Sequence, residues 1–585
     1  MNPWHFGTLA NWHLGKLNPW HFGSLAPWLI GKLNPWPILA WIILLSTGNS
    51  TLLAQTAPAT YWVQFTDKTH TPYSISEPQA YLSQRAIDRR ARQGIPIDSL
   101  DLPVDPVYIA QLLSAGNFQL LNVSKWFNAV TIRSTDTLAL DSLGLLGFVH
   151  DVRITKDGRL RPARHPQKFA QEKTYAQDYG DSFRQIEMMN GHLLHEAGGA
   201  KGQGMLIGVL DAGFRDADIL PGLAELRNRN GILLTKDLVE PGGNVYNEHY
   251  HGRSVLSLMA GHVAGELEGT APLANYVLVR TENGDSEYIV EEDNWVSGAE
   301  LCDSIGCDVL NTSLGYTTFD DPSQDHTYAD LNGLTSHMTL AADIAARKGM
   351  IPVNSAGNEG TSNWHYIGIP ADAFDILAVG AVNSDRFHAS FSSYGPAADG
   401  RVKPDVSAMG QAALGLNVVG TEVGPINGTS FSSPLVAGLV ACLWQLHPGR
   451  TAHQIMDAVR RSASQYNQPD ASLGYGIPDF WRAHLLLLGR DLTGLSSPEA
   501  LSLIPVPFSD HLDVEVYAGD ASTMSLTIHD MLGKLLWSTQ SGLEPHTYSR
   551  VRIQNDLLTK LRAGVYVVEV QVGGSRLTKR VVKAE

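Results

Sequence analysis

The stretch "NGTSFSSPLVAGLVACLWQL" at residues 427–446 decides the fold of the central part of this chain. Its second half is apolar on nearly every face, which predicts a helix buried on all sides. Gly428 permits a close approach to the backbone, and Pro434 is tolerated because the first turn of a helix needs no internal N–H bond. The pattern predicts one exposed hydroxyl, that of Ser430, at the mouth of a buried helix, although any single serine here could equally be a helix cap.

Short apolar strands alternate with helical patterns from about residue 183 to 488. They read "MLIGVL" (205–210), "CDVLNTSL" (307–314), "MIPVNSA" (350–356) and "DILAVGAV" (375–382). Apolar strands separated by helices are typical of an α/β fold, with a parallel sheet covered by helices on both faces. In such a sheet, functional residues gather beyond the carboxyl ends of the strands.

Two polar residues follow predicted strands closely. Asp211 comes directly after "MLIGVL", so its carboxylate should lie at the carboxyl end of that strand, although an Asp before Ala-Gly is often only a turn former. Asn358, in "NSAGNEG" (354–360), follows another strand, and its amide could donate a hydrogen bond to a developing oxyanion. The alternative for Asn358 is a polar turn.

His251 opens "HGRSVLSLMAG" (251–261), in which small residues precede a helix. At a helix N-terminus the dipole disfavours protonation of an imidazole, whereas a nearby carboxylate favours it. These opposed effects could leave His251 able to exchange a proton near neutral pH, as a general base must. A surface or capping histidine is the alternative; His249, two residues earlier, lacks the following glycine.

These signals are weak alone and strong in combination. An acid, a base, an oxyanion donor and a nucleophile follow one another as Asp211, His251, Asn358 and Ser430, each at an element boundary of one α/β domain. This chain order of Asp, His and Ser is that of subtilisin, not that of chymotrypsin or the α/β-hydrolases.

The blocks "GVLDAGF", "HGRSVLSLMAG", "NTSLG", "SAGNEG", "KPDVSAMG" and "NGTSFSSPLVAGLVA" resemble those of subtilisin-like serine proteases, the subtilase or S8 family, over roughly 205–450. The resemblance implies a subtilisin-like fold and a secreted serine endopeptidase that cleaves polypeptides through an acyl-enzyme. It implies a triad of Asp211, His251 and Ser430, with Asn358 as the oxyanion amide. It also implies substrate binding by Ser313, Leu314, Gly315, Ala356 and Gly357.

Some blocks depart from the family pattern. "HGRS" stands where His-Gly-Thr-His is usual, and "FSSP" where Met-Ala-Ala/Thr-Pro is usual. Neither change removes a catalytic atom, so they bear on the shape of the subsites. Calcium is common in the family and a structural calcium ion could bind, but the scattered Asp residues assign no ligand set, and no other cofactor is expected.

Three other functions stay open at this stage. A serine-carboxyl peptidase would share the fold but would have Glu in place of His251 and Asp in place of Asn358. A surface adhesin with a decayed protease fold would have lost at least one of the four groups. An esterase would carry Gly-x-Ser-x-Gly, whereas Ser430 lies in Gly-Thr-Ser-Phe-Ser.

The N-terminal flank divides into two segments. Residues 1–55 repeat Asn-Pro-Trp with a period of 16 and end in Lys32, the apolar "PILAWIILL" (37–45) and "LLAQ", which predicts a secretory signal peptide. Between 61 and 154 the periodicities give β-α-β-β-α-β, in which residues 79–94 form the first helix. This α+β, ferredoxin-like unit resembles the family's inhibitory propeptide, so 56–175 is expected to be a propeptide that ends in a cleavable, basic linker (156–181).

The remaining boundaries follow from a change of pattern. The catalytic domain is expected at 176–490, and residues 500–585 alternate as short strands with Gly-rich turns, which predicts a β-sandwich. This segment is similar to the sorting domain of Bacteroidetes type IX export substrates. It implies contact with the secretion machinery and a secreted or cell-surface location.

Composition excludes other classes. The 585 residues carry a net charge of −16 and no long run of Lys and Arg, so nucleic acid is not an expected partner. The three cysteines, Cys302, Cys307 and Cys442, are too few for a disulfide scaffold. A Cys302–Cys307 bridge stays open, because the sequence gives no geometry.

Overall fold

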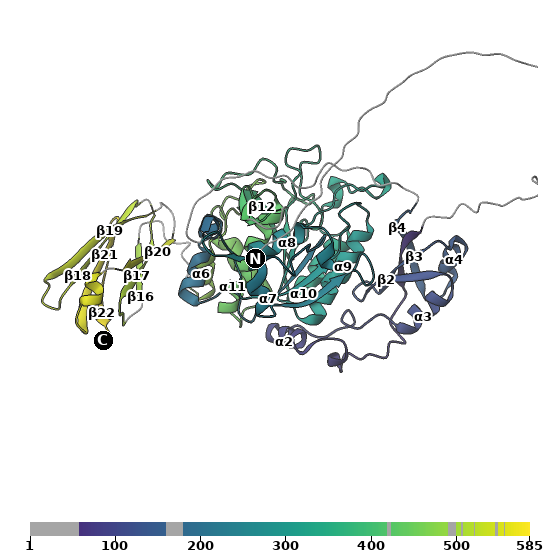
Figure 1. Cartoon of the computed structure of the whole chain (residues 1–585), viewed down its shortest axis with the longest axis horizontal. Coiled ribbons are helices and arrows are strands. Elements are labelled where there is room, and N and C mark those ends of the chain that lie inside the picture. Colours follow the sequence, from purple (N-terminus) through teal and green to yellow (C-terminus); the bar gives the residue numbers. More distant parts are fainter. Residues whose placement is uncertain are drawn as a thin grey trace, which may run out of the picture. The chain divides into compact units, whose positions relative to one another are not determined.

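A computed structural model of the chain describes residues 58–158, 180–417, 423–489, 499–504, 507–519, 521–543, 548–554 and 556–584. The predicted signal peptide (1–55) and most of the predicted linker (159–179) lie outside these residues. The described part contains an N-terminal α+β unit, a central α/β domain and a C-terminal β-domain (Figure 1).

The central domain is built on one seven-stranded sheet in which every pair of neighbouring strands is parallel. In spatial order the strands are β13 (Val406–Met409), β12 (Leu377–Val382), β11 (Ile351–Ser355), β10 (Val309–Thr312), β5 (Leu206–Asp211), β9 (Asn275–Arg280) and β6 (Ile232–Asp237). All four strands that the apolar runs predict are present, so the α/β prediction is confirmed.

Alternate residues of the same strands enter two different cores. On β5, Ile207 and Val209 pack with α8 (His251–Ala260) and α11 (Thr429–Leu446). Leu206 and Leu210 pack on the other face with α9 (Val290–Ile305), which lies against α10 (His337–Arg347). Burial on both faces explains why these strands read as continuous apolar runs and not as alternating ones.

Smaller elements complete the central domain. They are α5 (Phe183–Glu187), α6 (Gly191–Gly198), α7 (Ala224–Asn228), α12 (Ala452–Ser462), α13 (Phe480–Leu487), and the two-stranded pairs β7 (His262–Val263) with β8 (Leu267–Glu268) and β14 (Ala413–Leu416) with β15 (Val423–Ile426). Among the described helices only α11 is long and apolar enough to cross a membrane, but 89% of it is buried, so it is a core helix.

The N-terminal unit is a four-stranded antiparallel sheet with the order β2-β3-β1-β4. Its elements are β1 (Ala59–Phe65), α2 (Gln84–Gln93), α3 (Pro106–Ser114), β2 (Phe118–Ser124), β3 (Ala129–Ser134), α4 (Thr137–Ser142) and β4 (Val149–Lys156).

The sequence predicts one helix before β2, whereas the structure has two. The helix predicted at 79–94 begins only at Gln84, and α3 is added. Asp105 caps α3 by accepting from the Val107 N–H, and Pro106 occupies its first turn. Tyr108 and Leu112 of α3 pack into the core of the sheet, while α2 contacts α9 of the central domain.

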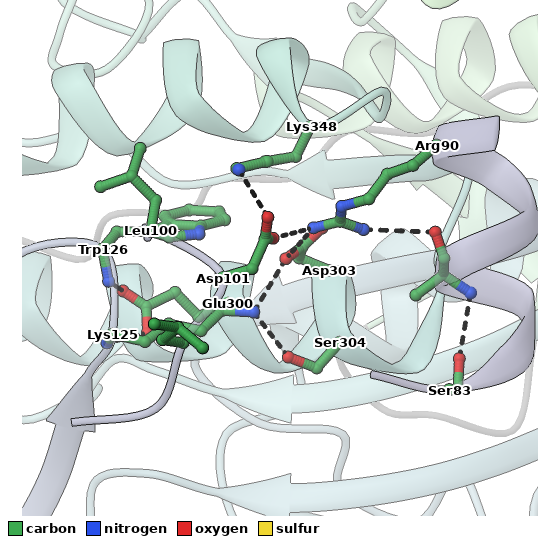
Figure 2. A network of polar contacts seen from close by, with 12 residues as sticks. Ser83, Arg90, Leu100, Asp101, Lys125, Trp126, Glu300, Asp303, Ser304 and Lys348 are labelled. Atoms are coloured by element: carbon green, nitrogen blue, oxygen red, sulfur yellow. Dashed lines mark hydrogen bonds and ion pairs between the residues drawn. The ribbon is translucent and has the colours of Figure 1, made fainter. Parts of the chain in front are cut away.

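The contact between these two domains contains a buried network of charges (Figure 2). Arg90 donates to Asp101 at 2.6 Å and to Asp303 of α9 at 2.8 Å. Lys125 reaches the second oxygen of Asp303 at 2.9 Å, and Lys348 of the central domain donates to Asp101 at 2.9 Å. Burial alone would raise the pKa of Asp303, but its cationic neighbours, Arg89 among them, hold that pKa well below its usual range.

A second carboxylate of α9 binds the backbone of the N-terminal unit. Glu300 accepts hydrogen bonds from the N–H groups of Lys125 and Trp126 at 2.6 and 3.0 Å, and from the Ser124 hydroxyl at 2.6 Å. Burial raises the pKa of Glu300 to about 7 in spite of these donors and of the Lys125 charge. The interface therefore contains a buried cluster of charged and hydrogen-bonded groups.

The C-terminal domain consists of two antiparallel sheets around one core. The three-stranded sheet has the order β16-β17-β20 and the four-stranded sheet β19-β18-β21-β22. Its elements are β16 (Glu499–Ile504), β17 (His511–Tyr517), β18 (Thr523–His529), β19 (Leu535–Gly542), β20 (Tyr548–Gln554), α14 (Asp556–Lys560), β21 (Gly564–Val572) and β22 (Ser575–Lys583). Val514 and Val516 of one sheet share a core with Leu526 and Val568 of the other. The predicted β-sandwich is present.

The cysteines carry free thiols in this structure, and all three are buried. The Cys302–Cys307 bridge that the sequence leaves open is therefore not formed here.

Candidate active site

Asp211 and His251 form a buried hydrogen-bonded pair at the carboxyl end of the central strand β5. The Nδ1 atom of His251 lies 2.8 Å from Oδ1 of Asp211, and both side chains are completely buried. The same Asp211 oxygen accepts from the N–H of Ala212 at 2.8 Å. Burial raises the pKa of Asp211, while the His251 imidazole lowers it, so the ionised carboxylate depends on its imidazole partner.

Gly252 explains how His251 comes so close to β5. A Cβ atom at this position would lie 2.5 Å from the Gly213 carbonyl oxygen and 2.8 Å from Cβ of Asp211. Any larger residue would therefore push the first turn of α8 away from the strand end. The glycine that distinguishes His251 from His249 in the sequence thus has a packing function.

Ser430 is the second residue of α11 and forms two reciprocal hydrogen bonds with Ser313. Its hydroxyl donates to the Ser313 carbonyl oxygen at 3.1 Å, and the Ser313 hydroxyl donates to the Ser430 carbonyl oxygen at 2.8 Å. The ring of the next residue, Phe431, lies 5.6 Å from the His251 ring, measured between centroids. The start of α11 therefore lies beside the imidazole.

The sequence predicts Pro434 in the first turn of the helix, but α11 already begins at Thr429. Pro434 therefore lies inside the helix. Inside a helix, a proline leaves the carbonyl four residues earlier without its N–H partner, and here that carbonyl belongs to Ser430. The Ser313 hydroxyl supplies the missing hydrogen bond. The proline is tolerated because a neighbouring strand end replaces the lost donor.

The other two serines of this stretch have structural partners. Ser432 donates to the Thr429 carbonyl oxygen at 2.9 Å, and Ser433 donates to Oδ1 of Asn311 at 3.0 Å. Both are completely buried, whereas Ser430 is 4% exposed and lines a cleft. Ser430 is the serine of the three with access to a substrate.

Asn358 is held in one orientation by Thr429. Its Oδ1 atom accepts from the Thr429 N–H at 2.8 Å and from the Thr429 hydroxyl at 3.0 Å. Because both partners are donors, the NH₂ group is the part of the amide that remains for donation into the cleft. Gly428 has φ +145°, a backbone conformation that residues with a side chain rarely adopt, so a glycine favours this approach of the chain to Asn358.

The cleft has a volume of about 130 Å³ and collects most of the predicted site residues. Its lining residues are Glu282, Ser313, Leu314, Gly315, Thr317, Ser355, Gly357, Asn358, Glu359, Gly368, Thr429 and Ser430. Ala356 does not line the cleft: its side chain belongs to the core beside α9, and its carbonyl accepts from the Gly368 N–H at 3.0 Å.

Sequence reasoning missed Glu282. It lies two residues after β9, so the strand-end argument that selected Asp211 also applies to it, but no catalytic motif contains it. Among the described residues, Glu282 forms with Glu287 and Glu291 a group of buried carboxylates whose oxygens lie within 4.8 Å of one another.

Three family models match the chain, in the order of its domains. The Peptidase S8 propeptide domain of Bacteroidota matches residues 60–172, the subtilase family 202–476, and the secretion system C-terminal sorting domain 502–584.

Individual relatives are similar to about half of the chain. Subtilisin DY of Bacillus licheniformis is 30% identical over 273 residues, which are 46% of this chain and 87% of that protein. Subtilisin NAT of Bacillus subtilis subsp. natto is 28% identical over 301 residues, or 51% of this chain and 70% of that protein.

Solved structures are also similar to about half of the chain. The prenylagaramide maturation protease PagA has a TM-score of 0.41 at 22% identity and covers 51% of this chain and 99% of its own. MycP1 from Mycobacterium smegmatis has a TM-score of 0.40 at 20% identity and covers 54% of this chain and 90% of its own.

The sorting domain marks the protein as secreted or attached to the cell surface. The subtilase match, the propeptide domain that precedes it and the similarity to subtilisin DY show that the chain belongs to the subtilase family of serine endopeptidases.

Proposed function

We propose that the protein hydrolyses peptide bonds through an acyl-enzyme formed on Ser430. The 2.8 Å contact between His251 and Asp211, beside a cleft that Ser430 and Asn358 line together, carries this proposal. Ser430 attacks the peptide carbonyl while Nε2 of His251 takes its proton. Asp211 keeps the imidazole in the right orientation and stabilises the imidazolium.

The negative charge that develops on the carbonyl oxygen needs donors that are already in place. The NH₂ group of Asn358, fixed by Thr429, is one such donor, and backbone N–H groups at the start of α11 are others. His251 then returns its proton to the leaving amine, and water, activated by the same imidazole, releases the acyl group. The substrate backbone is expected to pair with the edge Ser313–Gly315.

Activation requires one movement of a side chain. The Ser430 hydroxyl donates to Ser313 in this structure, so it has to turn about its Cα–Cβ bond toward His251 before it attacks. The hydrogen bond that it gives up is worth about 1 kcal/mol, which is small beside the barrier to peptide hydrolysis.

Ser430→Ala tests the assignment. We expect kcat to fall by about six orders of magnitude for casein or a peptide substrate. Ser433→Ala is the matched control, because Ser433 lies in the same stretch as Ser430 but donates to Asn311 in the core. A fluorophosphonate probe should label Ser430; labelling of Ser432 or Ser433, or undiminished hydrolysis by Ser430→Ala, would refute the assignment.

We also propose that the propeptide domain inhibits this site until the linker is cut. Residues 56–175 form the propeptide with its linker, 176–490 the catalytic domain, 500–585 the sorting domain, and 1–55 contain the signal peptide. The buried contacts of Asp303 and Glu300 with the propeptide support a tight complex. Mass spectrometry of the exported protein tests these boundaries, and the Ser430→Ala precursor shows whether the protein processes itself.

A further inference from the structure

One wall of the cleft carries a carboxylate that peptide hydrolysis does not use. Glu282 lines the cleft together with Ser430 and the edge Ser313–Gly315, and it is 2% exposed. The N–H of the preceding residue, Thr281, donates to the Asp211 carbonyl oxygen at 3.0 Å. Glu282 is therefore fixed beside the strand end that holds the catalytic pair.

The surroundings of Glu282 are strongly negative. Glu287 and Glu291 bring carboxylate oxygens within 4.8 Å of those of Glu282, and all three residues are buried. Burial and then the Glu282 charge raise the pKa of Tyr316, and Glu282 also adds to the raised pKa of Asp211. Negative charges this close favour a cationic group from outside.

A cation of the chain itself already approaches this corner. Lys156 ends β4 of the propeptide, and its ammonium lies 3.3 Å from the Ser286 hydroxyl and 4.8 Å from the centre of the Tyr288 ring. Burial lowers the pKa of this ammonium, while Glu291 raises it. The rim beside the acidic wall therefore accommodates a lysine side chain.

The sequence that follows Lys156 has the same character. The predicted linker contains Arg159, Arg161, Arg164 and Lys168, and no acidic residue stands between Asp157 and Glu172. In an acidic protein with a net charge of −16, this basic segment is unusual. It is also the segment that the proposed maturation has to cleave.

We propose that Glu282 is a specificity-determining residue that selects a lysine or arginine side chain on the acyl side of the scissile bond. The inference rests on the proposed hydrolysis at Ser430. A substrate strand along Ser313–Gly315 that presents its carbonyl to Ser430 passes Glu282, which the same cleft contains. A cationic side chain forms a charge-assisted hydrogen bond with this carboxylate, which a neutral side chain cannot form.

The test uses the exported, processed enzyme and quenched peptides that differ at a single position. Lysine, arginine, glutamine and methionine are compared at each of the four residues before the scissile bond. At one position we expect kcat/KM for lysine or arginine to exceed that for glutamine by at least about tenfold. In Glu282→Gln this ratio should fall to about one, while the glutamine peptide is still cleaved.

Glu359→Gln is the matched control, since Glu359 is a second carboxylate in the lining of the same cleft. Its ratio at the selected position should equal that of the wild type. Glu282→Met has a similar size without the charge and replaces Glu282→Gln if that variant does not mature. Fluorophosphonate labelling of Ser430 shows that each variant is folded and active.

Three results would overturn the inference. The first is a wild type without a preference for a basic residue at any position. The second is a set of Glu282 variants that keep the full preference. In the third, EDTA would abolish cleavage of basic and neutral peptides alike and Ca²⁺ would restore it only when Glu282 is present, which would assign Glu282 to a metal. In each case hydrolysis still depends on Ser430, so the proposed function would stand; only an active Ser430→Ala enzyme would remove both.

Discussion

Helices α9 and α11 cover opposite faces of one sheet, and both are almost completely buried, yet their sequences have opposite character. Between Thr429 and Leu446, α11 contains no charged residue. In contrast, α9 buries five acidic side chains, those of Glu291, Glu292, Asp293, Glu300 and Asp303. Buried apolar residues and buried charges therefore stabilise the two faces of the same domain by different means.

The difference between α9 and α11 follows from which domain supplies the residues that contact each helix. The residues around α11 belong to the central domain. Three acids of α9 instead have partners from the propeptide: Arg153 binds Asp293 at 2.7 Å, Lys125 and its neighbours bind Glu300, and Arg89, Arg90 and Lys125 surround Asp303. The burial of α11 does not involve the propeptide, whereas Asp293, Glu300 and Asp303 of α9 have their partners only while the propeptide is bound.

The largest effect should come from Asp303→Ala, in a Ser430→Ala background that keeps the precursor uncut. The change leaves three buried cations without their shared counter-charge, which costs about 3–5 kcal/mol. Denaturant unfolding of this precursor measures the loss, and so does the inhibition constant of added propeptide for the processed Asp303→Ala enzyme with Ser430 intact. In the processed enzyme the same substitution should change stability by less than about 1 kcal/mol; an equal loss in both forms would end the contrast between the helices.

Leu443→Ala in α11 should destabilise the precursor and the processed enzyme equally. Leu443 is completely buried, and removal of its side chain leaves a cavity that costs about 3 kcal/mol. Thermal and denaturant unfolding of both forms provide the measurement. Should the loss appear only in the precursor, the burial of α11 would depend on the propeptide.

Acid should weaken the hold of the propeptide through His337, the first residue of α10. Its Nδ1 atom lies 2.7 Å from Arg153 of the propeptide, and burial, helped by that guanidinium, lowers the pKa of His337 from 6.5 to about 4. The complex therefore favours neutral His337, and this contribution is lost as the pH falls below 6.5. Between pH 7 and 5 the loss amounts to about twentyfold in the dissociation constant of the propeptide.

Other groups at this contact titrate in the opposite sense. Burial raises the pKa of Asp293 to about 7, although Arg153 lowers it, so protonation of Asp293 favours the complex in acid. His337→Gln separates the two contributions, because the difference between this variant and the wild type belongs to His337. Identical pH profiles of propeptide inhibition in both proteins would contradict the prediction.

Two helix caps should give the smallest effects, about 1 kcal/mol each. Ser83 accepts from the Ala86 N–H at the start of α2 and donates to the Ile305 carbonyl at the end of α9, so Ser83→Ala should affect the precursor alone. Thr451 caps α12 within the central domain, so Thr451→Ala should affect both forms. Denaturant unfolding of both variants, each as precursor and as processed enzyme, measures these losses. A loss confined to the precursor in both variants would contradict the prediction for Thr451.

Sequence patterns predicted the parts that depend on local regularity. The four apolar runs became β5, β10, β11 and β12, and Ser313 and Asn358, which follow β10 and β11, line one cleft. Gly252, beside His251, marks a close approach that a single motif already indicates. The sheet and the neighbourhood of the candidate residues could therefore be derived without coordinates.

Features that depend on a distant partner could not be derived. The acidic residues of α9 are typical of a solvated helix, and the burial of Asp293 and Asp303 is explained by the propeptide's arginines and lysine. Pro434 was predicted to lie in the first turn because the role of the Ser313 hydroxyl, 121 positions away, is not visible in sequence. Glu282 was missed for the same reason, since its significance lies in the cleft and not in a motif.

The mutual hydrogen bonds of Ser430 and Ser313 imply a resting rotamer for the proposed nucleophile. The Ser313 carbonyl oxygen accepts the hydrogen bond of the resting Ser430 hydroxyl. The same carbonyl belongs to the edge along which a peptide would bind. Rotations about a single side-chain bond take picoseconds to nanoseconds, many orders of magnitude faster than enzymatic turnover. Rotation of Ser430 from its resting rotamer toward His251 therefore does not limit turnover. Without a substrate, the Ser430 hydroxyl stays hydrogen-bonded to the Ser313 carbonyl oxygen.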